Sequence, residues 1–233
     1  MDEGLADRAA ADPGAAPAAT IAFFGDSLTE GSPGAAFLPL LARRFGSFRL
    51  LNHGRAGDTV ADLLARAART GAGAVDLAFI WVGVNDAVMA TWGMPASASA
   101  HDWGERLAQA RGDYEESLGW VAARARRTVC VLPIVLEHPG SEWERNADEL
   151  GESIARVCDG VPGAETLDLR PAFAAAAASG QGPFTIDGVH FTSAGAAVVA
   201  GAFANVIDAA VDAVHGSDAS DARAHPHDPG GPP

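Results

Sequence analysis

A serine near the start of the sequence has the surroundings of a nucleophile. It lies in the segment 25–31, which reads GDSLTEG and follows the short apolar run 20–24. A serine on such a glycine-flanked turn can project its hydroxyl over the edge of a sheet, where the amides of a following helix face a developing oxyanion. The alternative is an ordinary glycine turn in which Ser27 caps the helix.

A histidine with an aspartate three residues before it could supply the base that such a hydroxyl needs. The segment 187–190 reads DGVH and directly precedes the last expected helix. Histidine is suited to accept a proton near neutral pH, and Asp187 would reach the other ring nitrogen of His190 in a tight turn. By itself, the segment is also compatible with a surface loop that contains an incidental Asp and His.

Two further turns follow apolar runs. The segment 52–59 reads NHGRAGDT, in which Gly54 and Gly57 permit close approach of the backbone to a ligand. The segment 83–86 reads GVND, and its Asn85 could point an amide N–H toward the same edge. Each segment, taken alone, is also typical of a plain polar turn.

The elements that must position these residues alternate between strand and helix along the chain. Apolar runs predict strands at 20–24, 48–52, 75–84, 128–135 and 165–169. Helical patterns are expected at 35–45, 59–69, 105–126, 142–158 and 193–214, with an irregular segment at 87–104. This alternation predicts an α/β fold, a three-layer α/β/α sandwich around a mainly parallel five-stranded sheet. Right-handed crossovers would bring the carboxyl ends of the strands, and the four motifs, to one edge.

Together, the four motifs resemble those of GDSL-type, or SGNH, hydrolases. The GDSLTEG block matches the family's nucleophile at Ser27, and the later blocks supply Gly57, Asn85 and the pair Asp187 and His190. The resemblance implies a flavodoxin-like SGNH hydrolase fold and a catalytic triad of Ser27, His190 and Asp187. It also implies an oxyanion hole built from the Ser27 and Gly57 amides and the Asn85 side chain, with no cofactor and no metal.

Five side chains are candidates for the substrate pocket: Trp92, Met94, Trp103, His138 and Phe184. The first three lie in the segment 87–104, which could form a lid or an acyl pocket on the functional edge, or simply pack over the core. His138 follows the predicted strand 128–135, so it could line the pocket or compete with His190 for the role of base.

The resemblance implies a serine hydrolase that cleaves small or short-chain acyl esters through an acyl-serine intermediate. A general esterase and a deacetylase of a small metabolite or sugar both fit this chemistry. Two alternatives stay open: an acyltransferase that uses the same acyl-serine, and a catalytically silent binding module on the same fold. The expected partner is a small-molecule acyl ester, and no protein partner is indicated.

The charge of the chain argues against polyanionic partners. The formal net charge is -14, of which residues 20–215 carry -9. Such acidity repels nucleic-acid phosphates and anionic membrane surfaces. Cys130 and Cys158 are too few to form a disulfide framework.

We expect one hydrolase domain over residues 20–215, with disordered segments at 1–19 and 216–233 that are rich in small residues, Pro and Asp. The N-terminus lacks the basic residues and the apolar region of a secretory signal. No uninterrupted apolar stretch of the sequence is long enough to span a bilayer. The expected location is therefore the cytoplasm.

Overall fold

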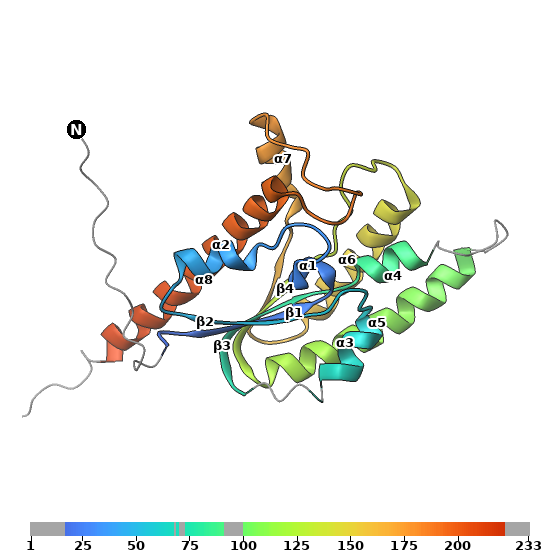
Figure 1. Ribbon diagram of the computed structural model, residues 1–233. Helices are drawn as coiled ribbons and strands as arrows, with labels where there is room; N and C mark the ends of the chain where they lie inside the picture. Colours follow the sequence, from blue (N-terminus) through green and yellow to red (C-terminus); the bar gives the residue numbers. More distant parts are fainter. Residues whose placement is uncertain (1–16, 68, 70–72, 91–99, 222–233) are drawn as a thin grey trace, which may run out of the picture.

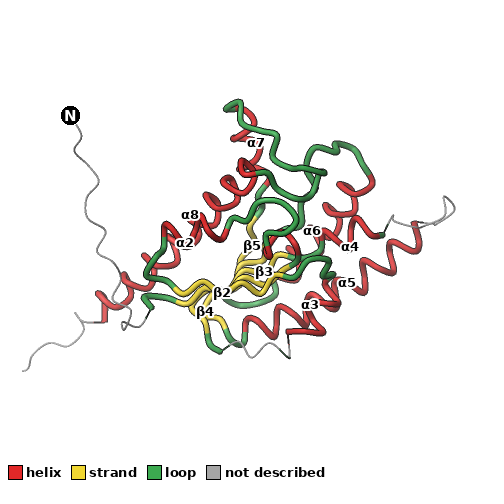
Figure 2. The backbone as a smooth tube through the Cα atoms, in the orientation of Figure 1, coloured by secondary structure: helices red, strands yellow, loops and turns green. Residues whose placement is uncertain are grey.

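A parallel sheet of five strands, in the order β2-β1-β3-β4-β5, forms the centre of the computed structural model, which describes residues 17–67, 69, 73–90 and 100–221. The strands are β1 (Thr20–Gly25), β2 (Arg49–Gly54), β3 (Val75–Trp81), β4 (Ala125–Val131) and β5 (Ala164–Leu167). All four pairings between neighbouring strands are parallel. This is the flavodoxin-like strand order, and the predicted three-layer α/β/α class is confirmed. Figure 2 shows the sheet in yellow between helices in red.

Helices cover both faces of the sheet. They are α1 (Ser27–Glu30), α2 (Leu38–Arg44), α3 (Val60–Ala67), α4 (Val84–Met89), α5 (Ala100–Ala122), α6 (Glu142–Asp159), α7 (Arg170–Ala178) and α8 (Ser193–Asp221). Helices α2, α7 and α8 lie on one face, and α3, α5 and α6 lie on the other (Figure 1). Each face therefore buries its own apolar cluster, as a sandwich of this class requires.

Neighbouring residues of the central strands point into opposite layers. Phe23 of β1 stacks on Phe79 of β3 at 5.0 Å between ring centroids, and Phe79 stacks on Phe203 of α8 at 4.6 Å. Phe24, the next residue of β1, meets the ring of Trp120 in α5 edge-on at 5.9 Å. Because both faces of the sheet are covered, β1 and β3 read in the sequence as nearly continuous apolar runs.

The central strand β3 ends earlier than predicted. It stops at Trp81 rather than at residue 84, because Gly83 takes the left-handed conformation (φ 119°) and turns the chain into α4. Asn85 therefore lies in the first turn of a helix and not at the end of a strand. The neighbouring strand β4 is also displaced toward the N-terminus, since it spans Ala125–Val131 instead of 128–135.

Three helices were absent from the sequence prediction. Helices α1 and α4 are short, with 4 and 6 residues, and begin within the GDSLTEG and GVND motifs, for which the sequence predicts turns. Helix α7 is nearly all alanine after Pro171, so it offers no amphipathic period to detect. The segment expected to be irregular at 87–104 contains the end of α4 and the start of α5.

The last helix, α8, is longer and more apolar than expected. It continues to Asp221, beyond the predicted end at residue 214 and into the segment 216–233 that was expected to form a tail. Its part Ser193–Val211 is long and apolar enough, by length and composition alone, to cross a membrane, which the sequence analysis did not anticipate. A helix that belongs to the core of a folded domain passes the same test, and Val199, Phe203 and Ile207 are fully buried against the sheet.

The register of the strands brings the motif turns together. Gly25 at the end of β1 pairs with Gly54 of β2 on one side and with Trp81 of β3 on the other. The segments that follow these three residues therefore leave the sheet at the same edge. Open parallel sheets bind their ligands at this edge.

Candidate active site

A serine, a histidine and an aspartate are hydrogen-bonded in series at this edge. Ser27 Oγ lies 3.0 Å from His190 Nε2, and His190 Nδ1 lies 2.7 Å from Asp187 Oδ2. Ser27 is the first residue of α1, whereas the other two lie in the loop before α8. An ionised carboxylate accepts the Nδ1 proton, which leaves the lone pair of Nε2 to accept from the serine hydroxyl.

The turn before Ser27 is determined by Asp26 and Gly25. Asp26 Oδ1 accepts from Leu28 N at 3.0 Å, so Asp26, and not Ser27, caps the short helix. This leaves the Ser27 hydroxyl available to His190. A Cβ on Gly25 would collide with Trp81 O of β3 and with Thr29, which explains why glycine precedes the motif.

The local turn of the last motif orients its own aspartate. Asp187 Oδ1 accepts from His190 N at 2.8 Å and from Val189 N at 3.0 Å, while Oδ2 faces the ring of His190. Burial alone would raise the pKa of Asp187, but the hydrogen bonds from the ring and backbone of His190 and from Val189 outweigh it and lower the pKa. Asp187 therefore remains an anion beside the imidazole.

Gly57 and Asn85 lie on two adjacent turns that are joined to each other. Asn85 Nδ2 donates to Asp58 O at 2.9 Å, which uses one of its two N–H groups. Gly57 has a φ of 83°, and a Cβ built on it would meet no atom within 4 Å. The backbone at Gly57 thus faces open space, as close approach by a ligand requires.

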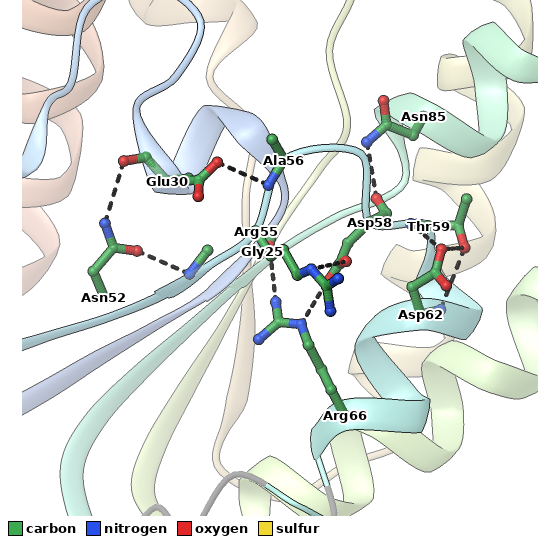
Figure 3. A network of polar contacts seen from close by, with 11 residues as sticks. Gly25, Glu30, Asn52, Arg55, Ala56, Asp58, Thr59, Asp62, Arg66 and Asn85 are labelled. Atoms are coloured by element: carbon green, nitrogen blue, oxygen red, sulfur yellow. Dashed lines mark hydrogen bonds and ion pairs between the residues drawn. The ribbon is translucent and has the colours of Figure 1, made fainter.

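Side chains that the sequence analysis did not single out hold the loop that carries Gly57 (Figure 3). Glu30 Oε2 accepts from Ala56 N at 2.9 Å. Arg66 of α3 forms an ion pair with the buried carboxylate of Asp58, and its Nη2 donates to Gly25 O at 2.8 Å. Arg66 therefore joins the loop after β2 to the last residue of β1.

Two more acidic side chains lie close to this loop, Asp26 fully buried and Asp86 partly buried. Burial is the main cause that raises the pKa of Asp26 to about 7 and that of Asp86 to about 6. Asp86 Oδ2 accepts from Val60 N at 3.1 Å, so it fixes the start of α3. Asp26 Oδ2 has no hydrogen-bond partner among the residues that the structure describes.

The candidate pocket residues have different surroundings. Trp92 and Met94 lie outside the described residues. Trp103 donates from Nε1 to Glu149 Oε2 at 2.6 Å, a contact that joins α5 to α6. Phe184 is buried in the core, where it packs edge-on against Phe173.

His138 contacts the DGVH loop at the backbone oxygen of Asp187, whereas Ser27 contacts the ring of His190. Its Nε2 lies 3.3 Å from Asp187 O, and its ring meets Trp143 edge-on at 5.7 Å. The hydrogen bond of Ser27 Oγ goes to His190 instead. The geometry thus favours His190 over His138 as the base.

No group of three or more His, Cys, Asp or Glu side chains is arranged to hold a metal ion within the described part of the chain. Cys130 and Cys158 are buried free thiols. Burial is the main cause that raises the pKa of each thiol, so neither is activated as a nucleophile.

A hydroxyl, an imidazole and a carboxylate in series, at the carboxyl edge of a parallel sheet, are the arrangement of the serine hydrolase class. The chain belongs to the GDSL-like Lipase/Acylhydrolase family, whose model matches residues 23–198. The predicted family is thereby confirmed, and the protein is an esterase-type enzyme of the GDSL class.

Solved structures of three other proteins share the fold. LAE5, an α/β hydrolase enzyme from the metagenome of Lake Arreo in Spain, has a TM-score of 0.66 and 22% identity, over 84% of this chain and 96% of its own. A G-D-S-L family lipolytic protein from Veillonella parvula has a TM-score of 0.64 and 15% identity, over 80% and 97%. Axe2, an acetylxylan esterase from Geobacillus stearothermophilus, has a TM-score of 0.63 and 20% identity, over 80% and 92%. Comparison with curated proteins gives no significant match.

Proposed function

We propose that the protein hydrolyses small or short-chain acyl esters through an acyl intermediate on Ser27. The observation that carries the proposal is the unbroken series from Ser27 Oγ through both ring nitrogens of His190 to Asp187. Residues 20–215 would constitute the hydrolase domain.

In the first half of the reaction, Ser27 Oγ attacks the ester carbonyl while its proton moves to His190 Nε2. Asp187 stabilises the resulting imidazolium and keeps the ring oriented. The tetrahedral intermediate then collapses, the bond to the alcohol breaks, and the Nε2 proton passes to the leaving alcohol. In the second half, water attacks the acyl group on Ser27 and loses a proton to Nε2. The bond between Oγ and the acyl carbon then breaks, the Nε2 proton returns to Ser27 Oγ, and the carboxylic acid is released.

Three donors would stabilise the oxyanion of each intermediate. Ser27 N lies at the start of α1, where amides have no partner within the helix. Gly57 N belongs to the loop that faces open space, and Asn85 has a second N–H besides the one bound to Asp58 O. Each such donor typically contributes about 3 kcal/mol to the transition state.

Acetyl esters of sugars or similar small alcohols are the substrate class that we favour. Axe2 is described as an acetylxylan esterase and as an acetyl-xylooligosaccharide esterase, and this chain matches 92% of its length. Two structures of Axe2 are of catalytic mutants, one at a serine and one at an aspartate. These are the residue types that we assign to Ser27 and Asp187.

The test measures hydrolysis of p-nitrophenyl esters from acetate to long acyl chains, together with acetate release from acetylated xylooligosaccharides. We expect turnover that falls with chain length, loss of turnover in Ser27→Ala, and normal turnover in Ser179→Ala, which removes an exposed hydroxyl bound to Ala175 O. Preference for long chains would contradict the short-acyl assignment.

A serine-reactive phosphonate separates the remaining outcomes. Labelling of Ser27 without ester hydrolysis would favour an acyltransferase that requires an acceptor alcohol. Failure of a folded protein to react at Ser27 would overturn the nucleophile assignment and favour a silent binding module.

A further inference from the structure

The segment that follows β4 holds the loop that carries Asp187 and His190. Leu136 N donates to Gly188 O at 2.9 Å, and His138 Nε2 lies 3.3 Å from Asp187 O. Gly188 has a φ of 90°, and a Cβ on it would collide with the ring of His138. The backbone of the loop is therefore pressed against residues 136–138.

Glu137 lies between Leu136 and His138 in the sequence, and its carboxylate makes further polar contacts with the chain just before the loop. Glu137 Oε1 accepts from Phe184 N at 2.9 Å, and Oε2 accepts from the hydroxyl of Thr185. The hydroxyl oxygen of Thr185 in turn accepts from Gly188 N at 3.0 Å. A hydroxyl has one proton, so its donation to Glu137 leaves its lone pairs directed at the Gly188 amide. The carboxylate thereby fixes both ends of the turn 185–188.

The backbone of Glu137 is strained for a residue with a side chain. Its φ is 63°, and it is the one non-glycine residue with a positive φ among those that the structure describes. Such a conformation persists where surrounding structure determines it, and strained residues of this kind cluster at functional sites. A glycine would relieve the strain but would lack the carboxylate.

Glu137 remains ionised in this position. Burial opposes ionisation, but the hydrogen bonds from Thr185 and Phe184 outweigh it and lower the pKa of Glu137. Hydrogen bonds to a charged acceptor are shorter and stronger than neutral ones. The anchor is therefore a charge-assisted contact to a buried hydroxyl, since Thr185 is 5% exposed.

We propose that Glu137 is a positioning residue for the active site: acting through Thr185, it holds the turn that aims the Asp187 carboxylate at His190 Nδ1. The proposal rests on the proposed function, because it requires Asp187 to orient the base. The hydrogen bonds of the Glu137 carboxylate within the described chain go to Phe184 and Thr185, so its effect passes through the loop.

The experiment compares Glu137→Gln, Glu137→Gly and Thr185→Val with three reference proteins. Gln replaces one of the two accepting oxygens by an NH₂ group that can only donate, and Gly removes the carboxylate while relieving the backbone strain. Thr185→Ser keeps the hydroxyl and serves as the conservative rescue. Glu144→Gln is the matched control, because the carboxylate of Glu144 accepts from Gly140 N, in the turn before α6.

Initial rates on p-nitrophenyl acetate are normalised to the sites that a serine-reactive phosphonate titrates. We expect kcat to fall about 10- to 100-fold in the first three variants with KM within about twofold, since a small misplacement of a reacting group has such an effect. Thr185→Ser and Glu144→Gln should match the wild type. Normal kcat per titrated site in Glu137→Gly and Thr185→Val would overturn the proposal, even if both melted at a lower temperature.

A spectroscopic readout separates failure of this proposal from failure of the proposed function. The proton between His190 Nδ1 and Asp187 should give a downfield NMR resonance, assigned by its loss in His190→Ala. We expect it to weaken or shift in Glu137→Gly and to persist in Glu144→Gln, whether or not any ester is turned over. An unchanged resonance in Glu137→Gly would overturn the positioning role, whereas active Ser27→Ala would instead overturn the proposed function.

Discussion

The side chain of Asn85 donates a hydrogen bond to the backbone oxygen of Asp58, with 2.9 Å between Nδ2 and O. Asn85 belongs to α4 and Asp58 directly follows Gly57, so this bond joins two of the proposed oxyanion donors. One N–H of the amide positions the loop, and we propose that the other donates to the oxyanion of the substrate. The same nitrogen of Asn85 would then serve both the loop and the reaction.

Replacement of Asn85 should therefore affect kcat more than KM. We expect Asn85→Ala to lower kcat about 100- to 1,000-fold, since loss of one oxyanion donor has this effect in serine hydrolases. Michaelis kinetics on p-nitrophenyl acetate provide the measurement. Asn205→Ala, at an exposed position of α8, is the matched control and should behave as the wild type. A loss of less than about threefold in Asn85→Ala would remove Asn85 from the oxyanion hole.

The losses in kcat caused by single substitutions in the triad should not multiply when the substitutions are combined. Asp187→Asn keeps the shape of the side chain but cannot stabilise the imidazolium, and we expect kcat to fall about 10,000-fold. Ser27→Ala combined with Asp187→Asn should be no slower than Ser27→Ala alone, because the aspartate acts through the nucleophile. The measurement is a double-mutant cycle, which compares the residual rates of the wild type, the two single variants and the double variant. Independent, multiplying losses would mean that the two residues do not belong to one catalytic unit.

The ion pair of Arg66 with Asp58 should contribute more to the free energy of unfolding than ion pairs on the surface do. The side chains are 13% and 6% exposed, and removal of Arg66 leaves the buried carboxylate of Asp58 with only the exposed guanidinium of Arg55, 4.0 Å away. We expect Arg66→Met to lower the free energy of unfolding by about 3 kcal/mol. Arg126→Met breaks an ion pair with Asp76 in which the two side chains are 70% and 44% exposed. We expect this variant to change the free energy of unfolding by less than about 1 kcal/mol. Urea unfolding of both variants tests the contrast, and equal losses would contradict it.

The parts of the site that local sequence determines were predictable. Asp187 and His190 are three residues apart, and their hydrogen bonds form within one turn. The nucleophile motif follows an apolar strand, and parallel topology then places its end beside the other turns. The parallel sheet and the edge that carries the site thus follow from alternation and chirality, whereas the flavodoxin-like order followed from the family resemblance.

The parts that depend on distant contacts were not predictable. The start of α4 requires a left-handed Gly83, and a Cβ there would come within 2.8 Å of Leu150 of α6. Arg66 reaches Gly25 across 41 residues, and Glu137 reaches Thr185 across 48. Neither side chain has a local pattern that marks its role. The one available signal for Glu137 was its position just after the predicted strand 128–135, although β4 itself ends at Val131.

Buried Asp26 should make stability decline as the pH rises. Its pKa is raised by burial from 3.8 to about 7, so between these values the folded state binds more protons than the unfolded state. Stability contributed by the neutral carboxyl is therefore fully present below about pH 4 and is lost as the pH rises toward 7. Between pH 5 and pH 8 the loss from this group amounts to about 2–3 kcal/mol.

Asp26→Asn removes this titration while its side-chain oxygen can still accept from Leu28 N. Urea unfolding should show that, from pH 5 to pH 8, the wild type loses about 2–3 kcal/mol of stability relative to Asp26→Asn. Asp159→Asn, at an exposed position at the end of α6, should follow the wild type at both pH values. If Asp26→Asn instead loses stability in parallel with the wild type, Asp26 is already ionised at pH 5. Its unpartnered Oδ2 would then be solvated or paired with a cation in solution.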